Sequence, residues 1–156
     1  MGSDSDLPVM QATIEVLDKF GVSREVKITS AHRTPERTHA YIRDADARGC
    51  AVFIAAAGMA AHLAGAVASL TVKPVIGVPV DAGSLQGMDA LLSTVQMPGG
   101  VPVACMAIGK AGAKNAGYLA VQIMAVHDPE LAALLKSDRD ANARSIEDKD
   151  AAIQSL

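Results

Sequence analysis

Short apolar runs alternate with helix-forming segments along this chain, and this alternation is the feature that most restricts its fold. Strands are predicted at residues 24–29, 51–56, 74–80 and 101–107. The run 51–56 is apolar throughout, which is typical of a strand covered on both faces. Strands that alternate with helices pair in parallel and are covered from two sides. The chain is therefore predicted to form an α/β fold, a three-layer αβα sandwich around a parallel sheet.

Local start and stop signals predict the helices between these strands. Thr34 and Pro35 begin one helix as its cap and first residue, and Gly49 ends it. The predicted helices are residues 7–20, 35–48, 60–70, 88–95 and 113–126, followed by one that starts at Asp128 and Pro129. Nine of the fifteen residues from 136 to 150 are charged, which predicts a solvated helix reaching away from the core. We expect a single domain of residues 1–156, with a C-terminal helix or tail from about residue 129.

Composition argues against several classes of protein. Aromatic residues are 3% of the chain and the net charge is −3, so neither a base-stacking platform nor a basic face for nucleic acid is expected. Residues 49–72 carry no Asp, Glu, Lys or Arg, but they are alanine-rich and interrupted by Gly58 and His62. We interpret them as strand, turn and helix rather than as a membrane span. The chain does not open with a signal-peptide pattern, and Cys50 and Cys105 are predicted to be buried free thiols, which favours a cytoplasmic protein.

Three turns hold the polar residues that could carry chemistry. The first turn, Gly2–Asp6, comes directly before a helix. A glycine and small hydroxyls at a helix N-terminus can bind an anion, because free backbone amides and the positive end of the helix dipole face the ligand. Plain capping of the helix by Ser5 or Asp6 explains the same residues without a ligand.

The second and third turns each lie between a predicted strand and a helix. In Ser30–Pro35, Arg33 can hold a phosphate through two parallel hydrogen bonds, and His32 can exchange protons near neutral pH. In Ala57–His62, small residues let the backbone approach a ligand, and His62 is either a polar contact or a core histidine. Ligands of open α/β sheets bind at this edge, so we expect a site there.

The remaining motifs narrow the chemistry. The sequence has no P-loop, no Gly-x-Gly-x-x-Gly and no compelling Ser–His–Asp order, and His32 and His62 lack a supporting cluster of metal ligands. His39 and His127 are interpreted as structural. The residues therefore predict proton transfer beside a small phosphate-bearing ligand, without a metal or cofactor.

These motifs together resemble a known family, the N5-carboxyaminoimidazole ribonucleotide mutases, which are the bacterial class I enzymes of purine (IMP) biosynthesis. The resemblance runs in matching order from Met1 to about Leu135. It implies a flavodoxin-like fold and an isomerase that moves a carboxylate by decarboxylation and recarboxylation, with no cofactor and no metal. It also implies a homo-octamer and a functional link to an N5-carboxyaminoimidazole ribonucleotide synthetase. The segments that carry it are Gly2–Asp6, Ser30–Pro35, Ala60–Leu63, Pro74–Val80, Val95–Pro102 and Ala107–Gly109.

The resemblance also implies roles for individual residues. It makes His32 the general acid and base and His62 a second active-site histidine. The substrate-binding residues that it implies are Ser3, Ser5 and Arg33 at the phosphate, Asp6 at the ribose hydroxyls, Ala57 and Gly58 around the carboxylate or carbon dioxide, and Ser30.

The chain departs from the family pattern at three positions of the third turn and at its start. Ala56 and Met59 replace glycines, and Ala64 replaces a proline. If residue 59 has a positive φ, a methionine there costs roughly 1–2 kcal/mol. We expect the turn to tolerate it, with Met59 narrowing the pocket or packing on a neighbour. The family also has an apolar strand before the Met1 turn, and we expect such a strand to precede residue 1.

Other functions remain open on the sequence. Class II relatives carboxylate aminoimidazole ribonucleotide directly with carbon dioxide, but their third turn differs from Ala60–Leu63. A non-catalytic nucleotide-binding module would not need His32 beside Arg33, and a receiver module would need an aspartate at the end of strand 51–56. A carboxylase of another pathway could share the fold. Residues 113–126 are apolar around most of a helix, which predicts either a central helix of one domain or a helix buried between subunits.

Overall fold

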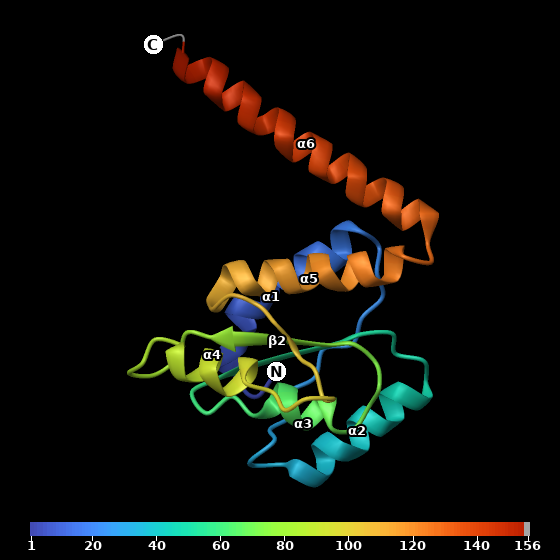
Figure 1. Cartoon of the computed structure of the whole chain (residues 1–156), viewed down its shortest axis with the longest axis vertical. Helices are drawn as coiled ribbons and strands as arrows, with labels where there is room; N and C mark the ends of the chain where they lie inside the picture. The colour runs from blue at the N-terminus through green and yellow to red at the C-terminus, as the bar shows by residue number, and fades with distance from the viewer. Residues whose placement is uncertain (155–156) are drawn as a thin grey trace.

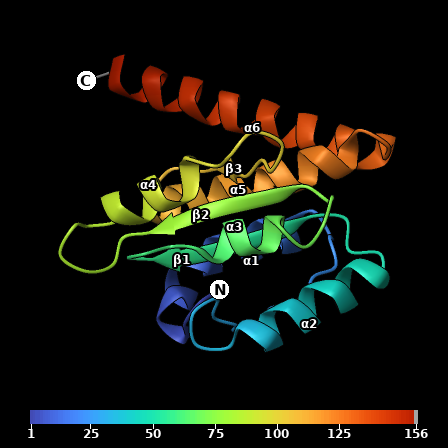
Figure 2. The same cartoon turned by 60° about the horizontal axis from the view of Figure 1, so that its bottom comes forward.

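The computed structural model describes residues 1–154 and arranges them in three layers (Figures 1 and 2). The middle layer is a parallel sheet in the order β1-β2-β3, formed by β1 (Phe53–Gly58), β2 (Val75–Val80) and β3 (Ala104–Cys105). The register of β1 and β2 runs from the pair Phe53 and Val75 to the pair Gly58 and Val80. The predicted αβα sandwich with a parallel sheet is therefore confirmed.

Helices cover both faces of this sheet. Helices α1 and α5 pack against each other on one face, and α2, α3 and α4 lie on the other (Figure 1). The long helix α6 projects beyond α5 and carries the C-terminal end of the chain away from the sheet (Figure 1). The helices are η1 (Asp4–Asp6), α1 (Leu7–Lys19), α2 (Pro35–Ala47), α3 (Leu63–Ala68), α4 (Met88–Val95), α5 (Gly109–Ala125) and α6 (Pro129–Gln154).

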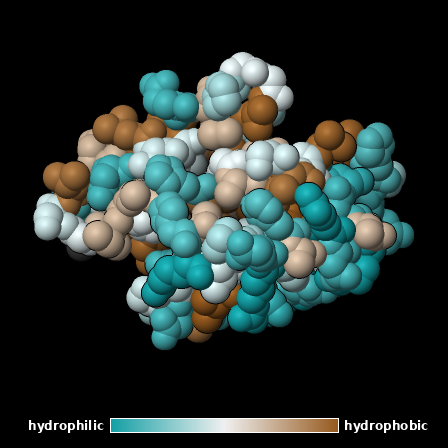
Figure 3. Space-filling model, turned by 90° about the horizontal axis from the view of Figure 1, so that it is seen from below, coloured by the Kyte–Doolittle hydropathy of each residue, from teal (hydrophilic) through white to brown (hydrophobic). Residues whose placement is uncertain are grey.

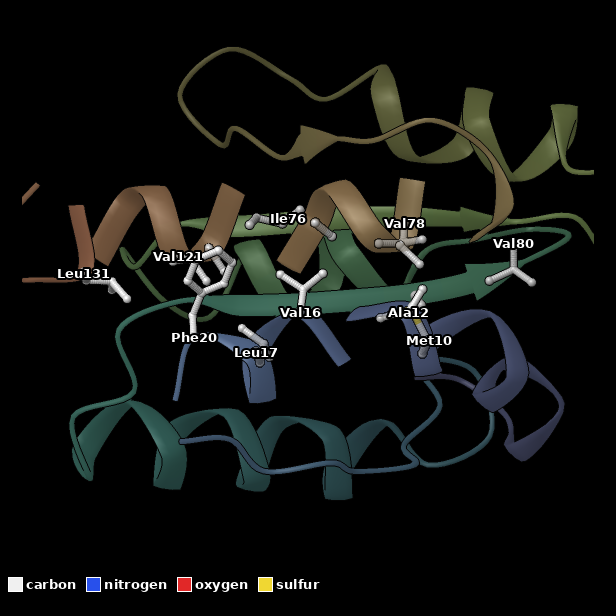
Figure 4. Close-up of a cluster of buried hydrophobic side chains, with 14 residues drawn as sticks. Met10, Ala12, Val16, Leu17, Phe20, Ile76, Val78, Val80, Val121 and Leu131 are labelled. Carbon is white, nitrogen blue, oxygen red and sulfur yellow. The ribbon is translucent and has the colours of Figure 1, made fainter. Parts of the chain in front are cut away.

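The main core lies between the sheet and the pair α1 and α5. Figure 4 shows Val16 of α1 close to the sheet residues Ile76 and Val78, with Val121 of α5 beside them. The two helices approach closely because residue 117 of α5 is a glycine: a Cβ there would stand 2.8 Å from Cβ of Val16. A second core of apolar side chains from α2, α3 and the strands fills the opposite face. That outer face is mainly hydrophilic, with hydrophobic side chains in separate small patches (Figure 3).

Helix boundaries agree with the sequence where the signals are local. Helix α1 ends before Gly21 and α2 before Gly49, and both glycines have positive φ, at 66° and 86°. Helix α2 begins at Pro35 with Thr34 in the cap position, as predicted. Helix α4 has the predicted bounds. Helix α5 begins four residues earlier than predicted, at Gly109 instead of residue 113.

The predicted strand at 24–29 is wrong, because this extended segment has almost no backbone partner. It is paired at one point, where Met1 N donates to the Lys27 carbonyl and Thr29 N donates to the Met1 carbonyl, both at 2.9 Å. Gly2 N in turn donates to the Ala56 carbonyl of β1 at 3.1 Å. Beyond Met1, a groove of about 530 Å³ separates residues 22–27 from residues 50–55.

Three other predicted segments differ in position or length. The strand predicted at 51–56 lies at 53–58, and the strand predicted at 101–107 keeps only two paired residues. The helix predicted at 60–70 is reduced to Leu63–Ala68. Residues 59–62 instead form the turn by which the chain leaves β1.

The C-terminal helix is solvated, as its charge pattern predicts. Leu131 in its first turn is buried, and most of the residues after it are exposed. Asp138 ties the helix to the body through an ion pair with Lys19 and a 2.8 Å hydrogen bond from the Tyr118 hydroxyl. Helix α5 is covered by α1, β2 and α6 of the same chain, so its apolar surface is explained by a central position.

Two further sequence predictions concern membranes and thiols. Within residues 1–154, every helix is too short or too polar to cross a membrane. Cys50 and Cys105 are free thiols, as predicted, but each is half-buried instead of fully buried. Burial raises the pKa of both thiols, which keeps them protonated at neutral pH.

Candidate active site

The candidate site lies at the carboxyl edge of the sheet, where β1 and β2 end side by side at Gly58 and Val80. The first turn reaches this edge through the hydrogen bond from Gly2 N to the Ala56 carbonyl. The second turn follows the extended segment that ends at Thr29. The third turn follows β1 directly, and the hydrogen bonds of Gly2 and Thr29 bring the other two turns to the same edge, which is where open α/β sheets bind ligands.

The first turn is held by reciprocal capping. Ser5 N donates to Ser3 Oγ at 3.3 Å, and Ser3 N donates to Asp6 Oδ2 at 3.1 Å, which forms a capping box at the start of η1. The cap is thus Ser3 with Asp6, and the sequence-based candidate Ser5 instead donates from its hydroxyl to Ser3 Oγ at 2.9 Å. Both serines remain accessible, Ser3 partly and Ser5 fully, whereas Asp6 is only 5% exposed.

The carboxyl of Asp6 has a raised pKa because it is buried. Desolvation raises its pKa, and the hydrogen bond from Ser3 N opposes that rise without cancelling it. The carboxylate is paired at one oxygen by the backbone of its own turn. A polar ligand that donates hydrogen bonds to this carboxylate would compensate its lost hydration.

The second turn is built from hydroxyl groups that bond the backbone. Ser30 N donates to Thr34 Oγ1 at 3.0 Å, and Arg33 N donates to Ser30 Oγ at 3.1 Å. Thr34 stands at the cap position of α2, but its side chain serves this turn and makes no capping hydrogen bond to the helix. Thr38 adds a hydrogen bond to the Ser30 carbonyl at 3.2 Å. Ser30 thereby fixes the backbone from which His32 and Arg33 project.

The two histidines named from the sequence are in direct contact. His32 Nε2 lies 2.7 Å from His62 Nδ1, so one imidazole donates a hydrogen bond to the other. Their rings meet edge to face, with centroids 4.9 Å apart and planes at 86°. Both side chains are exposed, which excludes the interpretation of His62 as a core histidine. The pair can accept a proton, release one, and pass one along the bond between the rings.

Arg33 joins the first and second turns. Its Nη2 donates to the carbonyl of Gly2, the residue before Ser3, at 3.3 Å, and the Arg33 side chain is exposed. A cation, two hydroxyls and the amides at a helix start suit a phosphate group. His39 and His127 are exposed on other parts of the surface, consistent with the prediction that they lie outside the site.

The third turn brings backbone close to this edge. Any residue larger than glycine at position 58 would force its neighbours to move, because a Cβ there would stand 2.7 Å from Cβ of Ala82. Met59 has a φ of 55°, which is rare outside glycine. The cost of roughly 1–2 kcal/mol that we expected for a methionine with a positive φ at this position therefore applies. Its side chain lies over Gly83, as packing on a neighbour predicts.

Sequence reasoning missed two features of the site. Thr34 and Thr38 were not named as supports of the Ser30 turn, although a hydroxyl four residues after Ser30 is a local signal for such a turn. The contact between Met59 and Gly83 has no sequence signal. Within the part of the chain that the structure describes, no three His, Cys, Asp or Glu side chains are grouped as a metal site would require.

The fold and the site define a class: an α/β protein with hydroxyls, an arginine and a contacting histidine pair gathered at the carboxyl edge of its sheet. The model of the AIR carboxylase family matches residues 1–145. The chain belongs to this family.

Similar proteins agree with this assignment. The N5-carboxyaminoimidazole ribonucleotide mutase of Synechocystis sp. is 55% identical over all of this chain and 88% of that protein. The proteins of the same name from Thermotoga maritima and Mycobacterium tuberculosis are 53% and 52% identical, over 96% and 100% of this chain and 86% and 88% of theirs. Among solved structures, Treponema denticola PurE superposes with a TM-score of 0.88 at 30% identity, covering 97% of this chain and 93% of that one. The flavodoxin-like fold implied by the sequence resemblance is consistent with this match.

Proposed function

We propose that this chain is an isomerase that converts N5-carboxyaminoimidazole ribonucleotide into 4-carboxyaminoimidazole ribonucleotide in purine biosynthesis. The observation that carries the proposal is the 2.7 Å contact between His32 and His62 at the mouth of a phosphate-type site. Relatives that are more than half identical to the chain bear the mutase name, which supports the same substrate here.

The substrate is held from its phosphate end. Ser3, Ser5 and Arg33 bind the phosphate, because their hydroxyls and guanidinium lie near the start of η1 and α1. Asp6 accepts hydrogen bonds from the ribose hydroxyls, which offsets the cost of its buried charge. Ser30 contributes indirectly: its hydroxyl accepts a hydrogen bond from Arg33 N and so shapes the turn that carries Arg33 and His32.

The reaction moves one carboxyl group and one proton. The bond from the substrate nitrogen to the carboxyl carbon breaks, its electron pair stays on nitrogen, and that nitrogen takes a proton from His32. Carbon 4 of the imidazole then forms a bond to carbon dioxide, and the proton on carbon 4 passes to His32. Electrons balance without an oxidant or reductant, so the reaction requires no redox cofactor. His62 receives or returns the proton of His32 and fixes the orientation of its ring.

Carbon dioxide has to be retained between the two half-reactions. Ala57 and Gly58 at the end of β1 carry no side chain larger than a methyl group, so carbon dioxide would lie against their backbone. Retention makes recapture effectively intramolecular, which raises the rate of the second step.

The decisive experiment supplies purified protein with N5-carboxyaminoimidazole ribonucleotide in buffer stripped of bicarbonate. Formation of the carbon-carboxylated product is expected. Product formed solely from aminoimidazole ribonucleotide with added bicarbonate would replace the proposal by direct carboxylation. Nucleotide binding without turnover in either assay would leave a non-catalytic binding module. The variant His39→Asn is the matched control, because His39 is exposed on α2 outside the site.

We further propose that the protein is a cytoplasmic homo-octamer whose residues 1–156 form one domain. Helix α4 supports the assembly, because four apolar side chains on its outer surface and in the preceding loop are 46–62% exposed: Leu85, Met88, Leu92 and Val95. Sedimentation at micromolar concentration tests this, and a monomer would contradict it. A separate N5-carboxyaminoimidazole ribonucleotide synthetase is the partner that supplies the substrate.

A further inference from the structure

Met59 holds a backbone conformation that its own side chain disfavours. Its φ is 55°, in the left-handed region, and its side chain is 59% exposed, so burial of that side chain does little to stabilise the conformation. Strained residues that lie beside a reactive group are often part of how the site works. Met59 lies between the end of β1 at Gly58 and the proton-transfer residue His62.

The side chain of Met59 spans two loops of the site edge. A Cβ placed on Gly83 would stand 3.3 Å from Cγ of Met59, 3.8 Å from Sδ and 3.9 Å from Cε, so the whole side chain runs along residue 83. Gly83 belongs to the loop from β2 to α4, residues 81–87. Met59 therefore packs the β1–α3 turn against the β2–α4 loop.

The β2–α4 loop is held near both of its ends, because Ala82 packs on Gly58 and Gly87 packs on Ile108. Gly83, Gln86 and Gly87 all have positive φ, at 74°, 50° and 84°. Its internal backbone hydrogen bonds include a long one from Gln86 N to the Gly83 carbonyl, at 3.4 Å. Met59 thus adds a contact at Gly83, between the two ends at which the loop is otherwise packed.

We propose that Met59 is a positioning residue that holds the β2–α4 loop over the end of β1 and limits the escape of carbon dioxide between decarboxylation and recarboxylation. The inference rests on the proposed function. Met59 takes no part in proton transfer, so its removal changes how often carbon dioxide is lost rather than whether it forms. Ala82 of this loop already packs on Gly58, where a Cβ would stand 2.7 Å from Cβ of Ala82, and Met59 adds a second contact between turn and loop at residue 83.

The test follows labelled carbon. Substrate carrying ¹³C in its carboxyl group is converted in unlabelled bicarbonate, and both the label kept in the product and the free aminoimidazole ribonucleotide are measured. For Met59→Ala we expect a loss of label to the solvent that is about threefold or more above the wild type. Met59→Leu, which keeps an apolar side chain over Gly83, is expected to retain label like the wild type. Equal retention in the alanine variant and the wild type would overturn the inference.

Two substrate-free measurements separate this inference from the proposed function. Hydrogen exchange of the backbone amides of residues 82–88 is expected to accelerate in Met59→Ala. Unchanged exchange would contradict the inference that Met59 holds the β2–α4 loop, even if the wild type isomerises the substrate. Met59→Gly is expected to raise the melting temperature, because glycine accepts the positive φ, yet to lose label as Met59→Ala does. Label retained by Met59→Gly would contradict the inference. A wild type that fails to isomerise would contradict the proposed function, and exchange would still decide whether Met59 holds the loop.

Discussion

Arg33 donates from Nη2 to the carbonyl oxygen of Gly2 across 3.3 Å, and this bond joins two turns whose residues are 31 positions apart in the chain. The guanidinium therefore has two roles. It fixes the first turn against the second, and its remaining donors are left for a ligand at the turn that contains Ser3 and Ser5.

Replacing Arg33 by methionine should weaken nucleotide binding much more than it slows turnover. Loss of a charge-assisted hydrogen bond costs about 1.5–3 kcal/mol, which corresponds to a roughly 10- to 100-fold rise in Kd. Calorimetry with aminoimidazole ribonucleotide measures the change. Arg43→Met, which alters an exposed arginine of α2, is the control. Equal affinities of the Arg33 variant and the wild type would remove Arg33 from the phosphate site.

The His32→Asn protein should bind nucleotide with near-normal affinity and show almost no turnover. Positioned acid–base groups typically contribute about 10²- to 10⁴-fold to a rate. Affinity and kcat are measured on the same preparation, alongside His39→Asn. Near-normal turnover of His32→Asn would show that another group moves the proton.

Asp6 gives a pH dependence of stability whose sign follows from its burial. Its pKa is raised in the folded protein, so folding is favoured by the protonated carboxyl. The contribution is present below the unfolded pKa, roughly 4, and is lost as the pH rises through the folded pKa. Asp6→Asn removes this titration but keeps an oxygen that can accept from Ser3 N.

The test of Asp6 compares urea unfolding at two pH values. The difference in unfolding free energy between Asp6→Asn and the wild type should favour the variant more at pH ~7 than at pH ~3.5. The same difference at both pH values would mean that the carboxyl titrates alike in the folded and unfolded chains. Asp4→Asn, in an exposed position of the same turn, is the control.

Gly117→Ala should destabilise the protein, and reducing Val16 to alanine should relieve only the clash with Cγ1, because alanine keeps the Cβ. A Cβ at residue 117 would meet Val16 at 2.8 Å and the Thr13 carbonyl oxygen at 3.1 Å, so Gly117→Ala is expected to cost about 1–3 kcal/mol. Adding Val16→Ala should recover part of that loss, which a double-mutant cycle by urea unfolding measures. Strict additivity would mean that the two residues do not compete for the same space.

The sequence predicted best those elements whose signals lie within the element. Pro35 and the glycines at 21 and 49 mark helix ends by their own backbone preferences, and the structure has those ends. Segment 24–29 has the alternation of a strand, yet a strand exists only when a neighbour pairs with it. Partners are a tertiary property, which is why this prediction was wrong and the strand at 101–107 kept two residues.

The same limit applies to the site. His32 and His62 were each named from the sequence, but their hydrogen bond joins residues 30 positions apart and depends on how the two turns meet. Ser30 was named without its purpose, which is to accept from Arg33 N. The chemistry of side chains could be inferred locally, whereas their pairing required the fold.

The close approach of Gly117 to Val16 also restricts which substitutions this sequence can accept during evolution. Shrinking residue 16 to alanine leaves its Cβ and the Thr13 carbonyl in place, so a larger residue 117 also requires the first helix to move. That helix begins directly after Asp6. A substitution at residue 117 lies in the interior, far from any ligand. It would nevertheless also move the turn that would bind the phosphate.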